Sequence, residues 1–143
     1  MSAAAGYSGT PLPKKLGFKP GQTAAFLNLP SDLDWLTQAE AFAAVARSAA
    51  SPAGEFDLIH AFYTDDARLT ADLPTLRDAI RPNGAVWISW PKKAAKVATD
   101  ITEDVIRAAA LDIGLVDVKV CAVSDIWSGL KLVIPVALRQ GRR

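Results

Sequence analysis

Ala85-Val86-Trp87-Ile88-Ser89-Trp90-Pro91-Lys92-Lys93 is the stretch that decides the fold of this chain. It begins with a mostly apolar run, and the proline that follows cannot donate a hydrogen bond to a sheet. The turn Arg81-Pro82-Asn83-Gly84 comes directly before it. The pattern predicts a buried strand over residues 85–90 that ends by delivering two lysines to a loop. Such strand ends are where open α/β sheets hold their ligands.

Two earlier apolar runs have the same character, Thr23 to Leu29 and Phe56 to Tyr63. Each is short, continuous and bounded by turn residues, which is typical of central parallel strands. The segment 40–50 is ambiguous, because its alanines favour a helix while Phe42 and Val45 also permit a strand. Helix and strand both remain open for this segment.

Helical patterns separate the predicted strands. Ser31 or Asp32 caps a short helix, and Asp65 or Asp66 caps a longer one. Pro74 lies within the longer helix and predicts a kink or break near Asp72. A third helix is predicted from the capping-box spacing of Asp100 and Glu103. Its expected core residues are Ile101, Val105, Ala108 and Ala109, flanked by Ile106 and Ile113.

The C-terminal part predicts two more strands. Val116, Val118 and Val120 alternate with polar residues, which indicates a half-buried strand with the valines facing the core. A last strand is expected over residues 130–138, where Pro135 argues for an edge or a bulge. The loop between them is too short for a crossover helix, so they should be antiparallel neighbours.

The predicted fold class is therefore α/β: a three-layer α/β/α sandwich with a mostly parallel, Rossmann-like sheet that ends in an antiparallel hairpin. A length of 143 residues indicates one domain, 1–143. Within it, residues 1–20 form a lid-like or loosely ordered N-terminal segment.

Composition excludes several classes of function. Hydrophobic residues make up 50% and charged residues 22%, as in a folded globular domain. Cys121 and His60 are the only residues of their types, so neither an internal disulfide nor a structural zinc site is expected. No apolar run is long enough for a membrane helix and no signal peptide is visible, which predicts a cytoplasmic protein without membrane contact. A net charge of +1 gives little support for nucleic-acid binding.

The run from Arg81 to Ser89 resembles the later half of Rossmann-like methyltransferases, in which a tight turn enters a central strand and an antiparallel hairpin closes the sheet. The chain as a whole resembles a family of small bacterial proteins that is classified as a domain of unknown function. The resembling stretches are Gly6-Tyr7-Ser8-Gly9-Thr10-Pro11-Leu12, Lys14-Lys15-Leu16-Gly17, Trp90-Pro91-Lys92-Lys93, Thr99-Asp100-Ile101-Thr102-Glu103, Lys119-Val120-Cys121-Ala122-Val123 and Trp127-Ser128-Gly129-Leu130. The resemblance implies a compact methyltransferase-like fold and brings no activity with it.

The chain departs from the methyltransferase pattern at two positions. Glycines normally follow the first strand so that the backbone can approach the cofactor. Here that position is Asn28-Leu29-Pro30-Ser31-Asp32, without a glycine. An acidic residue normally closes the second strand, but if segment 40–47 is that strand, its end offers Arg47 and Ser48. The sequence therefore predicts no cofactor, no metal and no catalytic residue.

A candidate surface for a ligand or partner comes from exposed polar and aromatic positions. Lys92 and Lys93 are expected beside the amino end of the helix at Asp100, where an anion is favoured, although the acidic residues there oppose it. The full surface consists of Asn28, Lys14, Lys15, Lys92, Lys93, Thr99, Asp100, Trp127 and Ser128. Lys14 and Lys15 belong to the N-terminal segment, and Trp127 is expected in a loop.

Other reactive residues have structural interpretations. His60 lies in the middle of an apolar strand and is interpreted as a buried, hydrogen-bonded histidine. Cys121 is interpreted as an inert, partly buried thiol. Trp87 and Trp90 must point to opposite faces of their strand, so they cannot line one pocket.

Three functional hypotheses follow. The favoured one is a small non-enzymatic module that binds a partner protein or a small anionic metabolite. The alternative is a divergent enzyme, dependent on S-adenosylmethionine or a nucleotide, that has lost the glycine-rich cofactor loop. The third is nucleic-acid binding through the basic segments. The sequence does not predict the oligomeric state.

Overall fold

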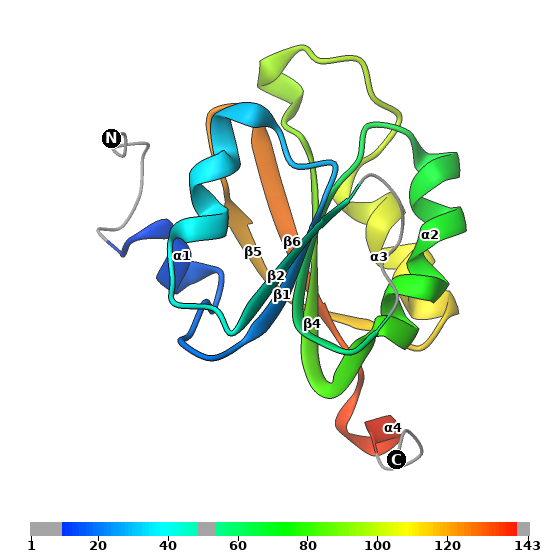
Figure 1. Cartoon of the computed structure of the whole chain (residues 1–143). Coiled ribbons are helices and arrows are strands. Elements are labelled where there is room, and N and C mark those ends of the chain that lie inside the picture. Colours follow the sequence, from blue (N-terminus) through cyan, green and yellow to red (C-terminus); the bar gives the residue numbers. More distant parts are fainter. Residues whose placement is uncertain (1–9, 49–53, 140–143) are drawn as a thin grey trace.

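The computed structural model describes residues 10–48 and 54–139, and these form a single mixed sheet with helices on both faces (Figure 1). The strand order is β2-β1-β3-β4-β6-β5. The strands are β1 (Thr23–Leu27), β2 (Ala44–Ser48), β3 (Phe56–Phe62), β4 (Ile80–Pro91), β5 (Val116–Ala122) and β6 (Trp127–Val133). The helices are α1 (Leu12–Lys15), the 3-10 helices η2 (Ser31–Gln38) and η3 (Lys93–Ala95), α2 (Asp66–Ala79), α3 (Glu103–Asp112) and α4 (Val136–Arg139).

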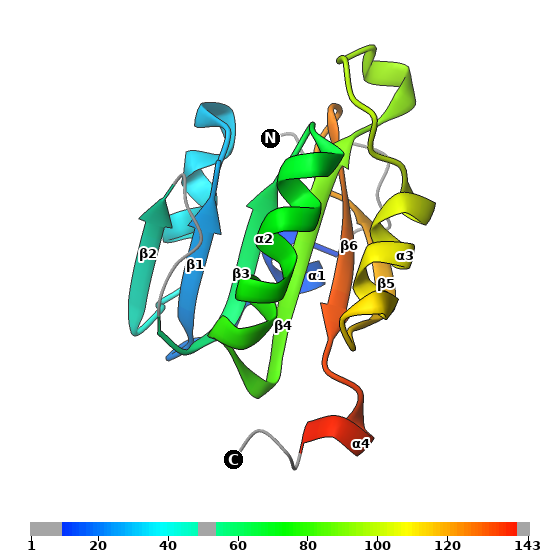
Figure 2. The ribbon, with the colours of Figure 1, turned by 90° about the vertical axis from the view of Figure 1, so that its right-hand side faces the viewer.

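The layers confirm the predicted sandwich. Helices α2 and α3 cover one face, with α2 in front of β3 and β4 (Figure 2), while α1 and η2 lie on the other face. Strands β2, β1, β3 and β4 are mutually parallel, and β6 runs antiparallel to both β4 and β5. The sheet is thus mostly parallel and ends in the expected antiparallel hairpin.

The ambiguous segment 40–50 contains a strand. Ala44–Ser48 pairs in parallel with β1, with Thr23 opposite Ala44. The outer edge of β1 offers unpaired backbone groups, and pairing with them outweighs the helical propensity of the alanines. Residues 49 and 50 lie outside the described part of the chain.

Strand β4 begins earlier than residue 85. It starts at Ile80, directly after α2, and the predicted turn at 81–84 is an irregularity within the strand, between the pairs Phe56–Ile80 and Leu58–Ala85. Gly84 makes this irregularity feasible. A β-carbon there would lie 3.0 Å from the carbonyl oxygen of Asp57 and 3.1 Å from that of Arg81.

Gly84→Ala is therefore expected to destabilise the protein by about 1–3 kcal/mol, because the added methyl group meets backbone atoms that cannot move independently. The midpoint of urea unfolding measures this effect. Gly21→Ala is a partial control, since its β-carbon would meet nothing within 4 Å and only the left-handed φ of 85° opposes it. A midpoint for Gly84→Ala equal to that of the unmodified protein would contradict the close approach.

Alternation along the strands creates two cores. Ile59, Val86, Ile88 and Trp90 belong to the core under α2 and α3, whereas Trp87 belongs to the core under α1 and η2. Trp87 and Trp90 thus lie on opposite faces, as strand geometry predicts. The Trp87 indole N–H also donates to the carbonyl oxygen of Leu16 at 2.9 Å, which fastens the N-terminal segment to the sheet.

The predicted break at Pro74 is wrong, because α2 continues through it. Pro74 is exposed, while Leu73 and Leu76 on the same helix are buried against the sheet. Their burial outweighs the single backbone hydrogen bond that a proline removes. The predicted cap at Asp65 is confirmed, since its carboxylate accepts from the Ala67 amide at 3.3 Å.

Helix α3 differs from its prediction at the cap and on the buried face. Thr102, not Asp100, is the N-cap, and its hydroxyl accepts from the Val105 amide at 3.2 Å. Ile106 and Ala110 are the buried residues of the helix, and the expected Ala109 and Ile113 pack against them partly buried. The expected Ile101 is buried just before the helix, whereas Ala108 is exposed. The buried face is therefore centred on Ile106 and Ala110 instead of Val105 and Ala108.

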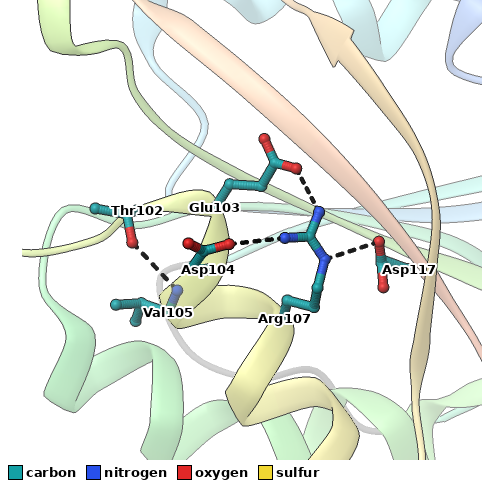
Figure 3. A network of polar contacts seen from close by, with 6 residues as sticks. All are labelled: Thr102, Glu103, Asp104, Val105, Arg107 and Asp117. Carbon is teal, nitrogen blue, oxygen red and sulfur yellow. Dashed lines mark hydrogen bonds and ion pairs between the residues drawn. The ribbon is translucent and has the colours of Figure 1, made fainter.

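Arg107 ties α3 to the edge of the sheet (Figure 3). Its guanidinium donates to Asp117 of β5 at 3.0 Å, to Asp104 at 2.9 Å and to Glu103. The bond to Asp117 joins α3 to β5, while Glu103 and Asp104, which lie on α3 itself, orient the guanidinium.

The prediction for β5 and β6 needs two corrections. Val118 and Val120 are 54% and 50% exposed, and Cys121 is the buried residue. The reason is that β5 is an edge strand whose register shifts between Asp117 and Lys119. Strand β6 occupies Trp127–Val133, so Pro135 follows the strand and precedes α4.

Within the predicted N-terminal segment 1–20, residues 1–9 lie outside the described part of the chain. Beyond them, α1 is followed by Leu16 and Phe18, which are both buried on the sheet. Among the residues that the structure describes, none of the helices has the length and apolar character needed to cross a bilayer.

Candidate functional site

The strand order of the sheet indicates where a ligand crevice would lie, namely between β1 and β3. From β1 the chain moves outward to β2, and it then crosses to β3 on the opposite side of β1. In open α/β sheets such a reversal of direction separates the loops at the carboxyl ends of the two strands, and ligands bind there. The candidate site is therefore the carboxyl edge of β1 and β3.

Asn28 occupies this edge immediately after β1. Its φ of 56° is left-handed, a conformation that asparagine adopts more readily than most residues. Its backbone amide donates to the carbonyl oxygen of Ser48 at 3.0 Å, and its side-chain Nδ2 donates to that of Phe62 at 3.1 Å. One residue thus links the ends of β1, β2 and β3.

The end of β2 is basic instead of acidic. Arg47 forms an ion pair with Asp34 of η2, and Ser48 is the last residue of the strand. Both partners of the ion pair are about half exposed, so the pair adds little to stability. It does hold η2 beside the carboxyl edge of β2.

The end of β3 brings an aromatic hydroxyl and two loops together. The Tyr63 hydroxyl donates to Asp72 of α2 at 2.8 Å. Burial, together with this bond, raises the pKa of the Tyr63 hydroxyl far above its ordinary value. Tyr63 is thus a proton-holding, structural group, and the next residue, Thr64, accepts a hydrogen bond from Thr99 at 2.7 Å.

Thr99 and Asp100, two of the predicted site residues, belong to the segment that follows β4 and folds back over α2. The Asp100 carboxylate accepts from the Asp66 amide at 2.8 Å, at the first turn of α2. Asp65 already accepts from Ala67 at the same helix end. Two carboxylates therefore occupy the end of α2 that would otherwise attract an anion.

Lys92 and Lys93 are not brought to a free helix end. The Lys92 amide donates to the carbonyl oxygen of Ile126 at 2.7 Å, and Lys93 is exposed at the start of η3. Helix α3 begins with Glu103 and Asp104, so its amino end also repels anions. Within the described residues, the amino ends of α2 and α3 both carry carboxylates, so neither provides these two lysines with an anion site.

Trp127 and Ser128 open strand β6, where they pair with Pro91 and Trp90. The expectation that Trp127 lies in a loop is wrong, because the antiparallel hairpin extends to this residue. Its ring meets that of Phe62 edge-on, with centroids 5.2 Å apart at 88°. Since Asn28 bonds to the carbonyl oxygen of Phe62, the structure brings Asn28 and Trp127 to one neighbourhood.

Lys14 and Lys15 lie in α1, away from this edge, on the face that carries Trp87.

His60 is fully buried on the face that carries Trp87, and its Nε2 lies 2.7 Å from the Ser89 hydroxyl. Burial lowers the pKa of His60 to about 3, so the ring is neutral at physiological pH. Sequence reasoning missed Ser89, which it treated only as part of an apolar strand. No group of three or more metal-ligating side chains occurs among the described residues.

Comparison with known proteins finds similar solved structures but no similar family model or curated sequence. No family model matches this chain, and no curated protein matches it by sequence. A ribosomal protein L11 methylase from Lactobacillus delbrueckii subsp. bulgaricus has 17% identity and a TM-score of 0.60, over 86% of this chain and 74% of that one. A SAM-dependent methyltransferase from Aquifex aeolicus has 14% identity and a TM-score of 0.62, over 85% and 87% of the two chains.

This protein has the methyltransferase-type fold. A third structure, magnesium protoporphyrin IX methyltransferase from Synechocystis PCC 6803 with bound SAM, has 16% identity and a TM-score of 0.61, over 80% and 71% of the chains. These findings overturn the expectation of a small non-enzymatic binding module, because several solved proteins of this fold are methyltransferases. The methyltransferase-like alternative is the better supported one.

SAM is the cofactor that this fold implies, and two residues at the site differ from those that usually hold it. The usual glycine after the first strand is replaced by Asn28, whose side chain crosses to β3. The usual acid at the end of the second strand is replaced by Arg47 and Ser48. These residues do not fit the cofactor in its usual manner, and no chemical step through it follows from them.

Proposed function

We propose that this protein is a divergent enzyme of the methyltransferase fold, dependent on SAM or a nucleotide, whose cofactor lies at the carboxyl edge between β1 and β3. The observation that carries the proposal is the reversal of strand order at β1, combined with the fold shared with solved methyltransferases. The glycine-rich loop of that fold is lost, so the contacts with the cofactor must differ.

Asn28 is the residue best placed to replace that loop. Its Nδ2 is used by the Phe62 carbonyl, and within the described part of the chain its Oδ1 has no hydrogen-bond donor. An adenosine group offers an exocyclic amine and ribose hydroxyls as donors to such an oxygen. The half-buried ring of Trp127, against Phe62, adds an aromatic surface nearby.

The test is isothermal titration of the full chain with SAM, S-adenosylhomocysteine and ATP, each separately. We expect saturable binding of at least one of them. Asn28→Asp keeps the size and the left-handed preference of the residue, but its carboxylate is repelled by the Phe62 carbonyl oxygen that Nδ2 binds. The oxygen that would meet the ligand is thereby displaced, so binding should weaken by about fivefold or more.

Asn83→Asp is the matched control, because it makes the same chemical change at an exposed position in the irregularity at the start of β4. Its affinity should equal that of the unmodified protein. Flat titrations with all three compounds would overturn the proposed function. Equal binding by Asn28→Asp would overturn the assignment of the site.

A further inference from the structure

A second feature of the protein is a cluster of lysines on the α1 face of the β5–β6 hairpin, away from the carboxyl edge of β1. Lys119 of β5 and Lys131 of β6 lie directly opposite each other in the antiparallel register. Like charges in such a pair destabilise a sheet. Lys131 is half-buried, which increases the cost of the repulsion.

The described residues contain no carboxylate that neutralises this pair. The ion pairs in that part of the chain involve arginines, and none includes Lys19, Lys119 or Lys131. Burial lowers the pKa of Lys131, and the charges of Lys119 and Lys19 lower it further. The remaining stretches, 1–9, 49–53 and 140–143, contain no aspartate or glutamate in their sequence. The lysine cluster is therefore not neutralised by an acidic side chain of this chain.

A hollow of about 300 Å³ lies beside Lys119 along the outer edge of β5. It is lined by Thr10, Lys15, Lys119, Val120, Cys121 and Ala122. The Lys119 ammonium donates to the carbonyl oxygen of Lys15 at 3.0 Å, which holds it at the hollow. Burial raises the pKa of the Cys121 thiol while Lys15 and Lys119 oppose that rise, so the positive field reaches into the hollow.

We propose that this hollow binds a small phosphate monoester. Its phosphate group would contact Lys119, with the Thr10 hydroxyl as a further donor, and its negative charge would offset the repulsion between Lys119 and Lys131 on the neighbouring strand. The volume suits a compact ligand, and on the outer edge of β5 the backbone groups are not paired with any strand of the described residues. This site lies on a different part of the sheet from the proposed cofactor site and does not depend on it.

The test compares glycerol 3-phosphate, inorganic phosphate and glycerol as ligands of the full chain at constant ionic strength, by calorimetry and thermal unfolding. We expect both phosphates to bind and to raise the unfolding temperature, and glycerol to do neither. The double variant Lys119→Gln with Lys131→Gln should lose at least about tenfold in affinity, because the charge-assisted hydrogen bond of Lys119 and the positive field of Lys131 are both lost.

A second readout does not require a ligand. Removal of the repulsion should leave the double variant at least as stable as the unmodified protein in phosphate-free buffer. Lys93→Gln, which removes one exposed charge from η3, is the control and should keep full affinity. Equal losses in the control and the double variant would overturn the site. The site would also be overturned if neither phosphate bound, including the case in which a short single-stranded oligonucleotide, added as a further ligand, bound instead.

Discussion

Lowering the pH from 7 to 5 is expected to reduce the free energy of unfolding by about 2 kcal/mol through His60 alone. In the folded protein burial lowers the pKa of His60 to about 3, whereas the unfolded chain has the ordinary value of 6.5. The unfolded state therefore binds a proton first as the pH falls. The stabilising contribution is complete above pH 6.5 and is lost progressively down to about pH 3.

The surroundings of His60 explain why it resists protonation. Its ring stacks on Phe62 with centroids 4.4 Å apart, and Nε2 meets the Ser89 hydroxyl. Nδ1 is buried and has no hydrogen-bond partner among the residues that the structure describes. A positive charge there would be fully shielded from solvent, and no carboxylate among the described residues pairs with the ring, so the fold favours the neutral form.

Urea unfolding at several pH values measures the effect, with His60→Gln as the matched variant. Gln is neutral at every pH and retains a polar group near Ser89. The difference in unfolding free energy between the two proteins should change with pH between 7 and 5, which separates His60 from the carboxylates that titrate at lower pH. A difference that stays constant over this range would contradict the burial of a neutral His60.

Trp87→Ala is expected to destabilise the protein by about 3–5 kcal/mol, because it removes a large, fully buried side chain. Trp87 also holds the N-terminal segment through its bond to the Leu16 carbonyl. Trp87→Phe should keep much of the packing and lose that bond, at a cost of about 1 kcal/mol beyond the packing loss. Urea unfolding measures the total effect of each variant.

Two controls make the Trp87 prediction specific. Trp35→Ala removes a tryptophan that is 49% exposed and should change the stability little. Trypsin cleavage after Lys14 and Lys15 should become faster in both Trp87 variants, since α1 loses its attachment to the sheet. Unchanged cleavage in Trp87→Phe would show that the bond to Leu16 does not hold α1.

The candidate site was only partly predictable. The sequence analysis included Asn28 in the candidate surface but predicted no cofactor there, because no glycine follows the first strand. The structure places Asn28 at the meeting point of β1, β2 and β3. The grouping of Lys92, Lys93 and Asp100 around one helix end was wrong. Asp100 serves α2, which begins 34 positions earlier in the chain, and local sequence patterns carry no information about such a contact.

The sequence by itself determined the elements whose formation depends on neighbouring residues. The continuous apolar runs predicted β1, β3 and β4, and Asp65 predicted the start of α2, because burial pattern and capping act within a few positions. These elements in turn predicted the layered α/β fold.

Only the tertiary structure decided the features that join distant segments. Ala44–Ser48 became a strand because β1 had an unpaired edge, and Pro74 was tolerated because α2 is packed on the sheet. The contact of His60 with Ser89 and the opposition of Lys119 to Lys131 depend on strand register. Register is set by the packing of the whole sheet, so a single segment of sequence cannot specify it.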